Sequence, residues 1–159
     1  MEILTISPNQ TKKTGTILAK EILKSSLRDK AFVFGLEGDL GGGKTTFLQG
    51  FTKGLGIGEK ILSPTFVILK KFEIPRTKAS LVRGRRNPEF KIFYHIDCYR
   101  IKKAKEILDL GFKEIISNPK NIVAVEWADR IRQIMPKGTI WLKFRLVDKN
   151  KRKIVVKPR

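Results

Sequence analysis

Residues 38–45 read Gly-Asp-Leu-Gly-Gly-Gly-Lys-Thr, which matches the G-x-x-x-x-G-K-[ST] pattern of phosphate-binding loops. Glycines in such a loop let successive backbone N–H groups converge on phosphate oxygens without Cβ clashes. The lysine places a positive charge on the β- and γ-phosphates, and the threonine hydroxyl is a ligand for Mg²⁺. We therefore predict that ATP or ADP is bound with Mg²⁺ by Gly41, Gly42, Gly43, Lys44, Thr45 and Thr46.

The loop lies in the sequence context that its chemistry requires, between a strand and a helix. Residues 31–36 form a short apolar run that suits a buried strand. Apolar residues from Phe47 to Leu55 recur at helical spacing, and Gly54 and Gly56 are suited to end that helix. This context makes the alternative, a glycine-rich turn that only joins a strand to a helix, the weaker interpretation.

Two further apolar runs each lead to an acid, at Asp97 and at Glu126. Ligands of α/β sheets bind beyond the carboxyl ends of the strands, where the phosphate loop also begins. We therefore expect both carboxylates near Lys44 and Thr45. Mg²⁺ takes carboxylate and hydroxyl oxygens, so Glu126 is predicted to be a metal ligand with Thr45. Asp97 is either a second metal-shell group or the group that orients the attacking water. The alternative for each acid alone is a turn residue or a helix N-cap.

Two side chains beside these acids have more than one interpretation. His95 is interpreted as a packed side chain of its strand rather than as a ligand or a base. Trp127 is either a core residue or a ring that covers the nucleotide. Lys44, Asp97 and Glu126 are the predicted catalytic residues.

Strands and helices alternate along the chain, which is typical of a layered α/β domain. Residues 139–147 and 153–156 alternate like the two arms of a terminal hairpin. We predict one domain over residues 1–159, with the three-layer sandwich of P-loop NTPases and a mixed, largely parallel central sheet. Residues 75–90 interrupt the pattern with prolines and arginines, and we interpret them as an exposed basic loop.

The composition of the chain limits the partners and the cellular location that we expect. The chain carries 34 Lys and Arg against 15 Asp and Glu, a net charge of +19. Such a surface favours polyanions, nucleic acid first and an acidic protein second, although a lysine-rich proteome is an alternative explanation. No run approaches the length of a membrane span. The first residues do not resemble a signal peptide, and Cys98 is the one cysteine. These features predict a cytoplasmic protein that is not bound to a membrane.

The motifs together resemble a known family. Residues 38–46, the segment Ser63-Pro64-Thr65-Phe66, the segment His95-Ile96-Asp97-Cys98-Tyr99-Arg100 and the pair Glu126-Trp127 follow one another in this order. This set is similar to the TsaE (YjeE) family of bacterial P-loop ATPases, and the resemblance runs from about Thr11 to Arg152.

The resemblance implies an ATP-binding and ATP-hydrolysing subunit of the machinery that places threonylcarbamoyl on the adenosine next to the anticodon of tRNA. The partners it implies are the TsaB–TsaD pair, with direct contact to tRNA left open. It implies that Thr45 and Glu126 hold Mg²⁺ and that Asp97 is needed for hydrolysis. It also implies that Thr65 lies in a switch-like loop, and that Thr11 and Arg152 lie at the base or ribose end of the nucleotide.

The chain departs from the family pattern in three ways: Gly42 stands where alanine is usual, the basic segment is long, and the charge is high. We expect Gly42 only to loosen the loop. Two rival functions remain open. One is a small-molecule kinase with Arg83, Arg85 and Arg86 in a lid, and the other is an RNA-binding protein whose nucleotide site is regulatory. No N-K-x-D segment is present, which argues against a GTPase.

Overall fold

A computed structural model describes residues 1–25, 29–61, 67–75 and 90–157 of the chain. The helices, including one 3-10 helix (η2), are α1 (Pro8–Lys24), α2 (Lys44–Gly54), α3 (Lys105–Leu108), α4 (Phe112–Ser117) and η2 (Ala128–Ile134). The strands are β1 (Glu2–Thr5), β2 (Phe32–Gly38), β3 (Leu69–Glu73), β4 (Ile92–Asp97), β5 (Asn121–Glu126), β6 (Ile140–Leu146) and β7 (Arg152–Lys157).

The strands form a single mixed sheet in the order β1-β7-β6-β2-β5-β4-β3. The four central strands, β6, β2, β5 and β4, pair in parallel. The outer pairs β1–β7, β7–β6 and β4–β3 are antiparallel. The mixed sheet and the C-terminal hairpin of β6 and β7 are thus confirmed, and parallel pairing is limited to the centre of the sheet.

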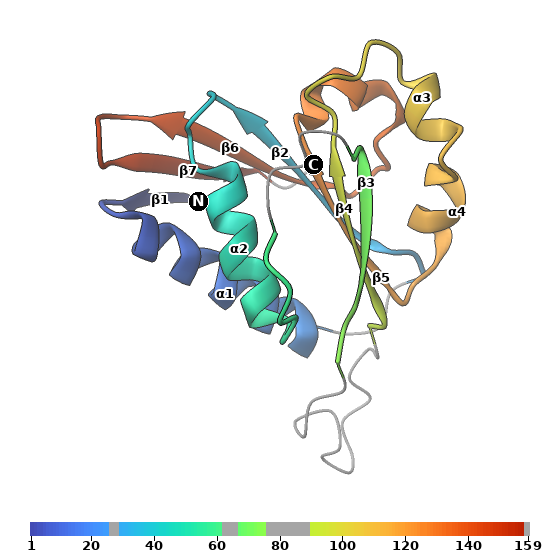
Figure 1. Cartoon of the computed structure of the whole chain (residues 1–159), viewed down its shortest axis with the longest axis horizontal. Helices are drawn as coiled ribbons and strands as arrows, with labels where there is room; N and C mark the ends of the chain where they lie inside the picture. Colours follow the sequence, from blue (N-terminus) through green and yellow to red (C-terminus); the bar gives the residue numbers. More distant parts are fainter. Residues whose placement is uncertain (26–28, 62–66, 76–89, 158–159) are drawn as a thin grey trace.

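Helices cover both faces of the sheet, which gives the predicted three layers (Figure 1). One core cluster joins α1 and α2 to one face, with Phe34, Phe51 and Phe93 fully buried. The second cluster joins α3, α4 and η2 to the other face, around Val123 and Phe112. Successive strand residues face opposite sides. The apolar runs of β2 and β5 therefore supply both cores, which explains why they are almost continuous.

The phosphate-loop helix α2 is held by very close contact with α1. A Cβ added at Gly50 would lie 1.9 Å from the carbonyl oxygen of Lys12, and one at Gly15 would lie 2.2 Å from that of Phe47. Both distances are too short for any side chain, so these two positions require glycine. Thr16 Oγ1 donates to the Gly50 carbonyl oxygen at 2.8 Å across the same contact.

Two local expectations differ from the structure. The sequence from Lys102 to Leu110 predicts a helix that ends at Gly111. The structure has a single helical turn there, α3, and a second helix, α4, follows directly after Gly111. Gly111 has φ +80°, a left-handed conformation that breaks the helical pattern in two. The sequence also predicts a short helix at residues 128–134, and the structure has one there of the 3-10 type. No helix within the described ranges is long and apolar enough to cross a membrane.

Candidate nucleotide-binding site

The phosphate loop connects β2 to α2, and three of its glycines have backbone conformations that other residues rarely adopt. Gly38, Gly41 and Gly43 have φ values of +115°, +71° and +97°, where a Cβ would be strained. Gly43 is the residue before α2, and it makes no side-chain capping bond to the helix. The first N–H groups of an uncapped helix, together with its dipole, favour an anion at that position. The geometry of the loop therefore suits a phosphate.

The space around Gly42 is smaller than the sequence suggested. A Cβ there would lie 2.9 Å from the carbonyl oxygen of Asp39 and 3.3 Å from the Cβ of Phe144 in β6. An alanine would thus require a small shift of the loop. The expectation that glycine merely loosens this position is incomplete, because the loop is packed against the neighbouring strand.

Lys44 lies within the loop rather than in solvent, with 5% of its surface exposed. Its Nζ donates to the carbonyl oxygens of Gly38 and Asp39, both at 2.8 Å, and lies 3.8 Å from the ring centre of Trp127. Burial lowers the pKa of Lys44, while the nearby carboxylate of Glu126 opposes that change. Incoming phosphates would replace carbonyl oxygens as the partners of this ammonium group.

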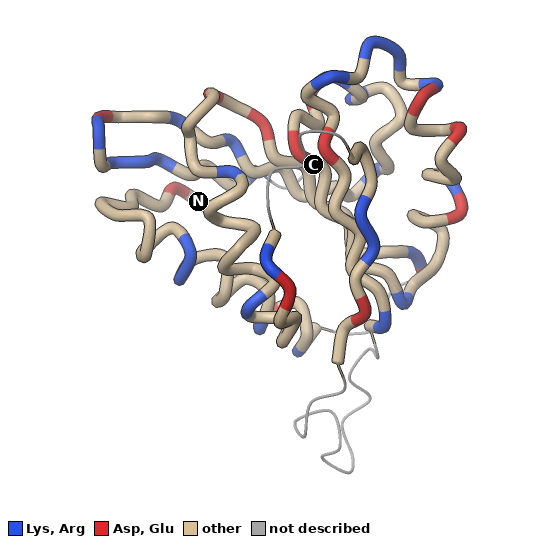
Figure 2. Tube along the Cα trace, viewed as in Figure 1, with Lys and Arg blue, Asp and Glu red and all other residues tan. Residues whose placement is uncertain are grey.

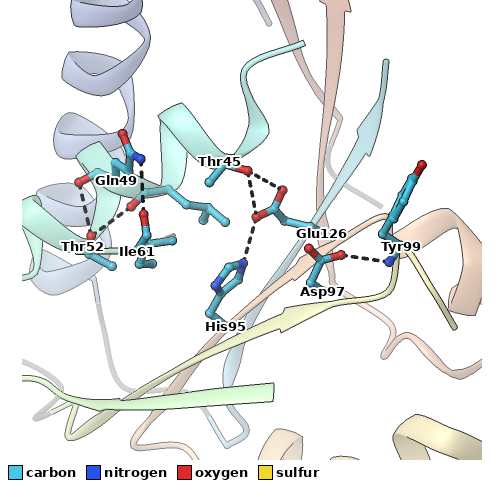
Figure 3. Close-up of polar contacts among 9 residues, drawn as sticks. Thr45, Gln49, Thr52, Ile61, His95, Asp97, Tyr99 and Glu126 are labelled. Atoms are coloured by element: carbon cyan, nitrogen blue, oxygen red, sulfur yellow. Dashed lines mark hydrogen bonds and ion pairs between the residues drawn. The ribbon is translucent and has the colours of Figure 1, made fainter. Parts of the chain in front are cut away.

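Thr45, Glu126 and His95 form one connected polar group, drawn from α2, β5 and β4 (Figure 3). Thr45 Oγ1 donates to the two carboxylate oxygens of Glu126 at 3.1 and 3.4 Å. His95 Nε2 donates to Glu126 Oε1 at 2.9 Å, and both side chains are almost fully buried. The structure thus brings the predicted metal ligands Thr45 and Glu126 into direct contact.

Asp97 lies beside Glu126, because the two residues are partners in the register of β4 and β5. The side chain is buried, and its Oδ1 accepts a hydrogen bond from the backbone N–H of Tyr99 at 2.8 Å. Burial raises the pKa of Asp97, and the charge of Glu126 adds to that, whereas the bond from Tyr99 lowers it. Both acids are therefore at the strand ends that the sequence predicted.

The same face of the sheet carries all of these groups. His95 and Asp97 are two residues apart on β4 and so share a face, and Glu126 points to that face from β5 towards Thr45 (Figure 3). Sequence reasoning interpreted His95 as a packed side chain, which is correct, but missed its bond to Glu126. The period of two in the segment from His95 to Asp97 is the signal that could have revealed it.

Trp127 occupies an unusual backbone position next to Glu126. Its φ of +56° is the one positive value at a non-glycine residue within the described ranges. A bulky residue in this region is strained, and such strain is often found at functional sites. Its ring lies 5.2 Å from the ring of Tyr99, besides its contact with Lys44. Trp127 therefore packs at the edge of a core and also against the phosphate loop.

Thr11, Thr46 and Arg152 lie at a small pocket on the hairpin side of the loop. The pocket, of about 60 Å³, lies between the start of α1 and the turn of the β6–β7 hairpin. Arg152 Nε donates to the carbonyl oxygen of Gly41 at 3.0 Å. Thr11 is buried and shares a 2.8 Å hydrogen bond with Thr5. Residues far apart in the sequence thus meet beside the predicted phosphate site. The pocket is lined by Pro8, Thr11, Gly41, Gly43, Thr46, Lys149, Asn150 and Arg152.

The oxygen donors of Thr45 and Glu126 fit Mg²⁺, which prefers hard oxygen ligands and keeps several waters. Within the described part of the chain, no group of three or more His, Cys, Asp and Glu side chains forms a metal site by itself. The predicted switch segment with Thr65, and the basic loop with Arg83, Arg85 and Arg86, fall on residues 62–66 and 76–89, outside the described residues.

Comparison with known proteins gives one consistent result. A solved structure, titled "Crystal structure of Bacillus subtilus YdiB", is similar with a TM-score of 0.66 and 27% identity, over 97% of this chain and 82% of that one. Proteins named tRNA threonylcarbamoyladenosine biosynthesis protein TsaE are also similar. The one from Bacillus subtilis is 33% identical over 94% of this chain and 80% of the relative. The one from Treponema pallidum is 29% identical over 98% and 99%.

None of these relatives is named as a kinase, so the rival function with an arginine lid gains no support. A family model described as "Threonylcarbamoyl adenosine biosynthesis protein TsaE" matches residues 5–154, which is nearly the whole chain. Its range contains the phosphate loop, His95, Asp97 and Glu126. The chain therefore belongs to the TsaE family.

Proposed function

We propose that this chain is a single-domain, Mg²⁺-dependent ATPase that serves the threonylcarbamoyl modification of tRNA. The observation that carries the proposal is the contact of Thr45 with Glu126 directly below the phosphate loop. The names of the relatives supply the pathway, because they are tRNA threonylcarbamoyladenosine biosynthesis proteins. From this role we infer that the protein acts in the cytoplasm.

The loop and the start of α2 bind the phosphates of ATP or ADP. Gly41 and Gly43 offer backbone N–H groups, Lys44 offers its charge, and Thr46 adds a hydroxyl at the helix start. The N–H of Gly42 donates to the carbonyl oxygen of Asp39 at 3.0 Å, and it would exchange this partner for a phosphate oxygen when nucleotide binds. The small pocket beside the loop favours the ribose or base end of the nucleotide near Thr11 and Arg152. The ring of Trp127 packs against Lys44 Nζ at 3.8 Å, and we infer that it covers the nucleotide at this end of the site.

Thr45 and Glu126, which are in contact, would hold Mg²⁺, and Asp97, the register partner of Glu126, would act in its outer shell. When bound, Mg²⁺ neutralises charge on the β- and γ-phosphate oxygens. His95 fixes the rotation of the Glu126 carboxylate through a buried hydrogen bond. Metal ligands are commonly held in this way by a second group.

Asp97 acts in hydrolysis rather than in nucleotide binding. Its buried carboxylate lies beside Glu126, where it orients the water that attacks the γ-phosphate. Phosphoryl transfer relies mainly on positioning and charge stabilisation. We propose that the TsaB–TsaD pair completes this positioning, so that the isolated chain hydrolyses ATP slowly.

A matched pair of substitutions tests the metal role. Thr45→Ser keeps a hydroxyl at this position, whereas Thr45→Val keeps the shape and loses the oxygen. We expect Mg²⁺-dependent ATP hydrolysis, measured with the TsaB–TsaD pair present, to survive in Thr45→Ser and to fall by at least about 100-fold in Thr45→Val. Equal turnover in the two variants would remove Thr45 from the metal site.

A second measurement tests the dependence on partners. ATP hydrolysis is compared for the chain alone, with the TsaB–TsaD pair, and with the pair and tRNA. We expect turnover to rise only when the pair is present. Full turnover by the chain alone would contradict activation by partners, while leaving the nucleotide site intact.

A further inference from the structure

The strands β6, β7 and β1 extend the sheet beyond its helical cover on one face. Their apolar residues Phe144, Ile154 and Ile3 face the core beneath α1 and α2. The alternate residues face the other way, while α3 and α4 pack around β4 and β5 at the far end of the sheet (Figure 1). No helix of the described part of the chain therefore covers this second face of β6, β7 and β1.

The open face is basic. We define the basic sheet face as Lys143 and Arg145 of β6 with Lys153 and Lys157 of β7, which alternate with the core residues. Arg145 lies opposite Lys153 in the register, and Lys157 lies opposite Trp141. Figure 2 shows Lys and Arg positions along both arms of this hairpin. Residues two apart on a strand are about 7 Å from each other, so the charges form a regular grid.

Among the described residues, ion pairs neutralise only a small part of this charge. Lys153 pairs with Glu2 at 2.6 Å, and Glu37, the register partner of Lys143, pairs with Arg132 of η2. For Lys143, Arg145 and Lys157, no ion pair occurs among the described residues. Like charges on neighbouring strands repel one another and lower stability. Their arrangement is therefore explained more readily by an anionic ligand than by the fold.

The side chains of the basic sheet face also indicate which part of a polyanion it would contact. Trp141 is the aromatic residue of this face, but it is buried, and the guanidinium of Arg132 lies 4.1 Å from its ring centre. No base could stack on it without displacing Arg132. A flat grid of cations without an exposed ring suits a phosphate backbone, read without regard to base sequence.

We propose that the basic sheet face binds the phosphate backbone of RNA, and that its occupant is the tRNA substrate of the pathway. That this RNA is tRNA rests on the proposed function. That the face binds an anion rests only on the charged residues of the basic sheet face. An acidic protein is the other candidate occupant. Protein interfaces usually centre on apolar and aromatic anchors, and Leu4 is the one large apolar side chain exposed within these strands on this face. The face therefore fits RNA better.

Binding of a fluorescently labelled tRNA transcript, measured by anisotropy over a series of KCl concentrations, tests the proposal. The test variant is K143Q/R145Q/K157Q. Its matched control is K13Q/K20Q/K53Q, which removes the same charge from exposed positions of α1 and α2 on the opposite side of the sheet. We expect the test variant to bind tRNA about 10- to 100-fold more weakly near 0.1 M salt, with a salt slope reduced by about 2 to 3. The control should resemble the wild type.

Three results would overturn the proposal: unchanged tRNA binding in the test variant, equal losses in both variants, or wild-type binding of poly-glutamate as strong as that of tRNA. The last result would assign the face to an acidic protein. Calorimetry with Mg-ADP on the same proteins separates this inference from the proposed function. If the wild type does not bind Mg-ADP, the proposed ATPase function is refuted. RNA binding by the basic sheet face can still be measured in that case. Both triple variants should bind Mg-ADP as the wild type does.

Discussion

His95 Nε2 lies 2.9 Å from Glu126 Oε1, and the two side chains are 1% and 2% exposed. The same carboxylate accepts from Thr45 Oγ1. One acid thus links β4, β5 and the first turn of α2. A buried carboxylate held on two sides has little freedom to rotate, which is the property required of a metal ligand.

His95→Ala should slow ATP hydrolysis without abolishing nucleotide binding. Removal of the imidazole leaves Glu126 with one fewer donor, so its carboxylate is less well oriented. We expect kcat to fall by about 10- to 100-fold, as is typical when the partner of a metal ligand is lost. The free energy of unfolding should fall by about 1–3 kcal/mol, because a buried acceptor loses its partner. Turnover is measured with the TsaB–TsaD pair, and stability by urea unfolding.

Two further variants separate positioning from simple packing. His95→Gln retains an N–H donor and should recover part of the turnover, along with a lower Mg²⁺ requirement than His95→Ala. Tyr94→Phe changes the neighbouring residue, on the opposite face of β4, and should leave turnover unchanged. Equal defects in His95→Ala and His95→Gln, at equal stability, would contradict a role through the hydrogen bond.

Lys44→Met should weaken nucleotide binding but not destabilise the fold. The ammonium group is buried, and burial lowers its pKa, so the folded state gains little from this charge. Its hydrogen bond to phosphate should contribute about 1.5–3 kcal/mol, which corresponds to about 10- to 100-fold in affinity. Calorimetry with Mg-ADP and thermal unfolding measure the two effects. Unchanged affinity would rule out this loop as the phosphate site.

Cys98 should resist alkylation in the folded protein. The side chain is fully buried, and burial raises the pKa of the thiol to about 12. The thiolate is the reactive species, so at pH 8 only about one thiol in 10⁴ would be ionised. We expect iodoacetamide to react at least about 100-fold more slowly with the native chain than with the chain in urea. Similar rates in the two states would show that this strand end opens readily.

The sequence predicted the site better than it predicted the edges of the sheet. The loop motif, the apolar runs and the two acids at their ends place Thr45, Asp97 and Glu126 together by topology alone. The contact between Thr45 and Glu126 confirms that these two meet. Their chemical roles, and that of Lys44, stay predictions until they are measured.

Longer-range features were not readable from local patterns. The antiparallel pairing of β1 with β7 joins the two ends of the chain, and no local signal specifies that register. The end of a helix at Gly111 was predicted, but the shortness of α3 and the second helix α4 directly after Gly111 were missed. The left-handed Trp127 was also unforeseen, since a bulky residue rarely adopts positive φ. Tertiary packing decides all three.

Asp97→Asn should stabilise the protein at neutral pH and abolish its turnover. Burial raises the pKa of Asp97 above 3.8, the value expected in the unfolded chain. The folded state then holds its proton more tightly than the unfolded state does. As pH rises from 3.8 through the folded pKa, the wild type therefore loses stability relative to a variant that does not titrate. Each unit of raised pKa corresponds to about 1.4 kcal/mol.

Asparagine does not titrate, and its side-chain oxygen can still accept the N–H of Tyr99. We therefore expect the free energy of urea unfolding of Asp97→Asn to exceed that of the wild type at pH 7. The difference should shrink steadily towards pH 4. Mg-ADP affinity should change little, while ATP hydrolysis with the TsaB–TsaD pair should be lost, because the role of Asp97 is confined to the transition state. A stability difference independent of pH would show that the buried charge is not its cause, and wild-type turnover would remove Asp97 from the reaction.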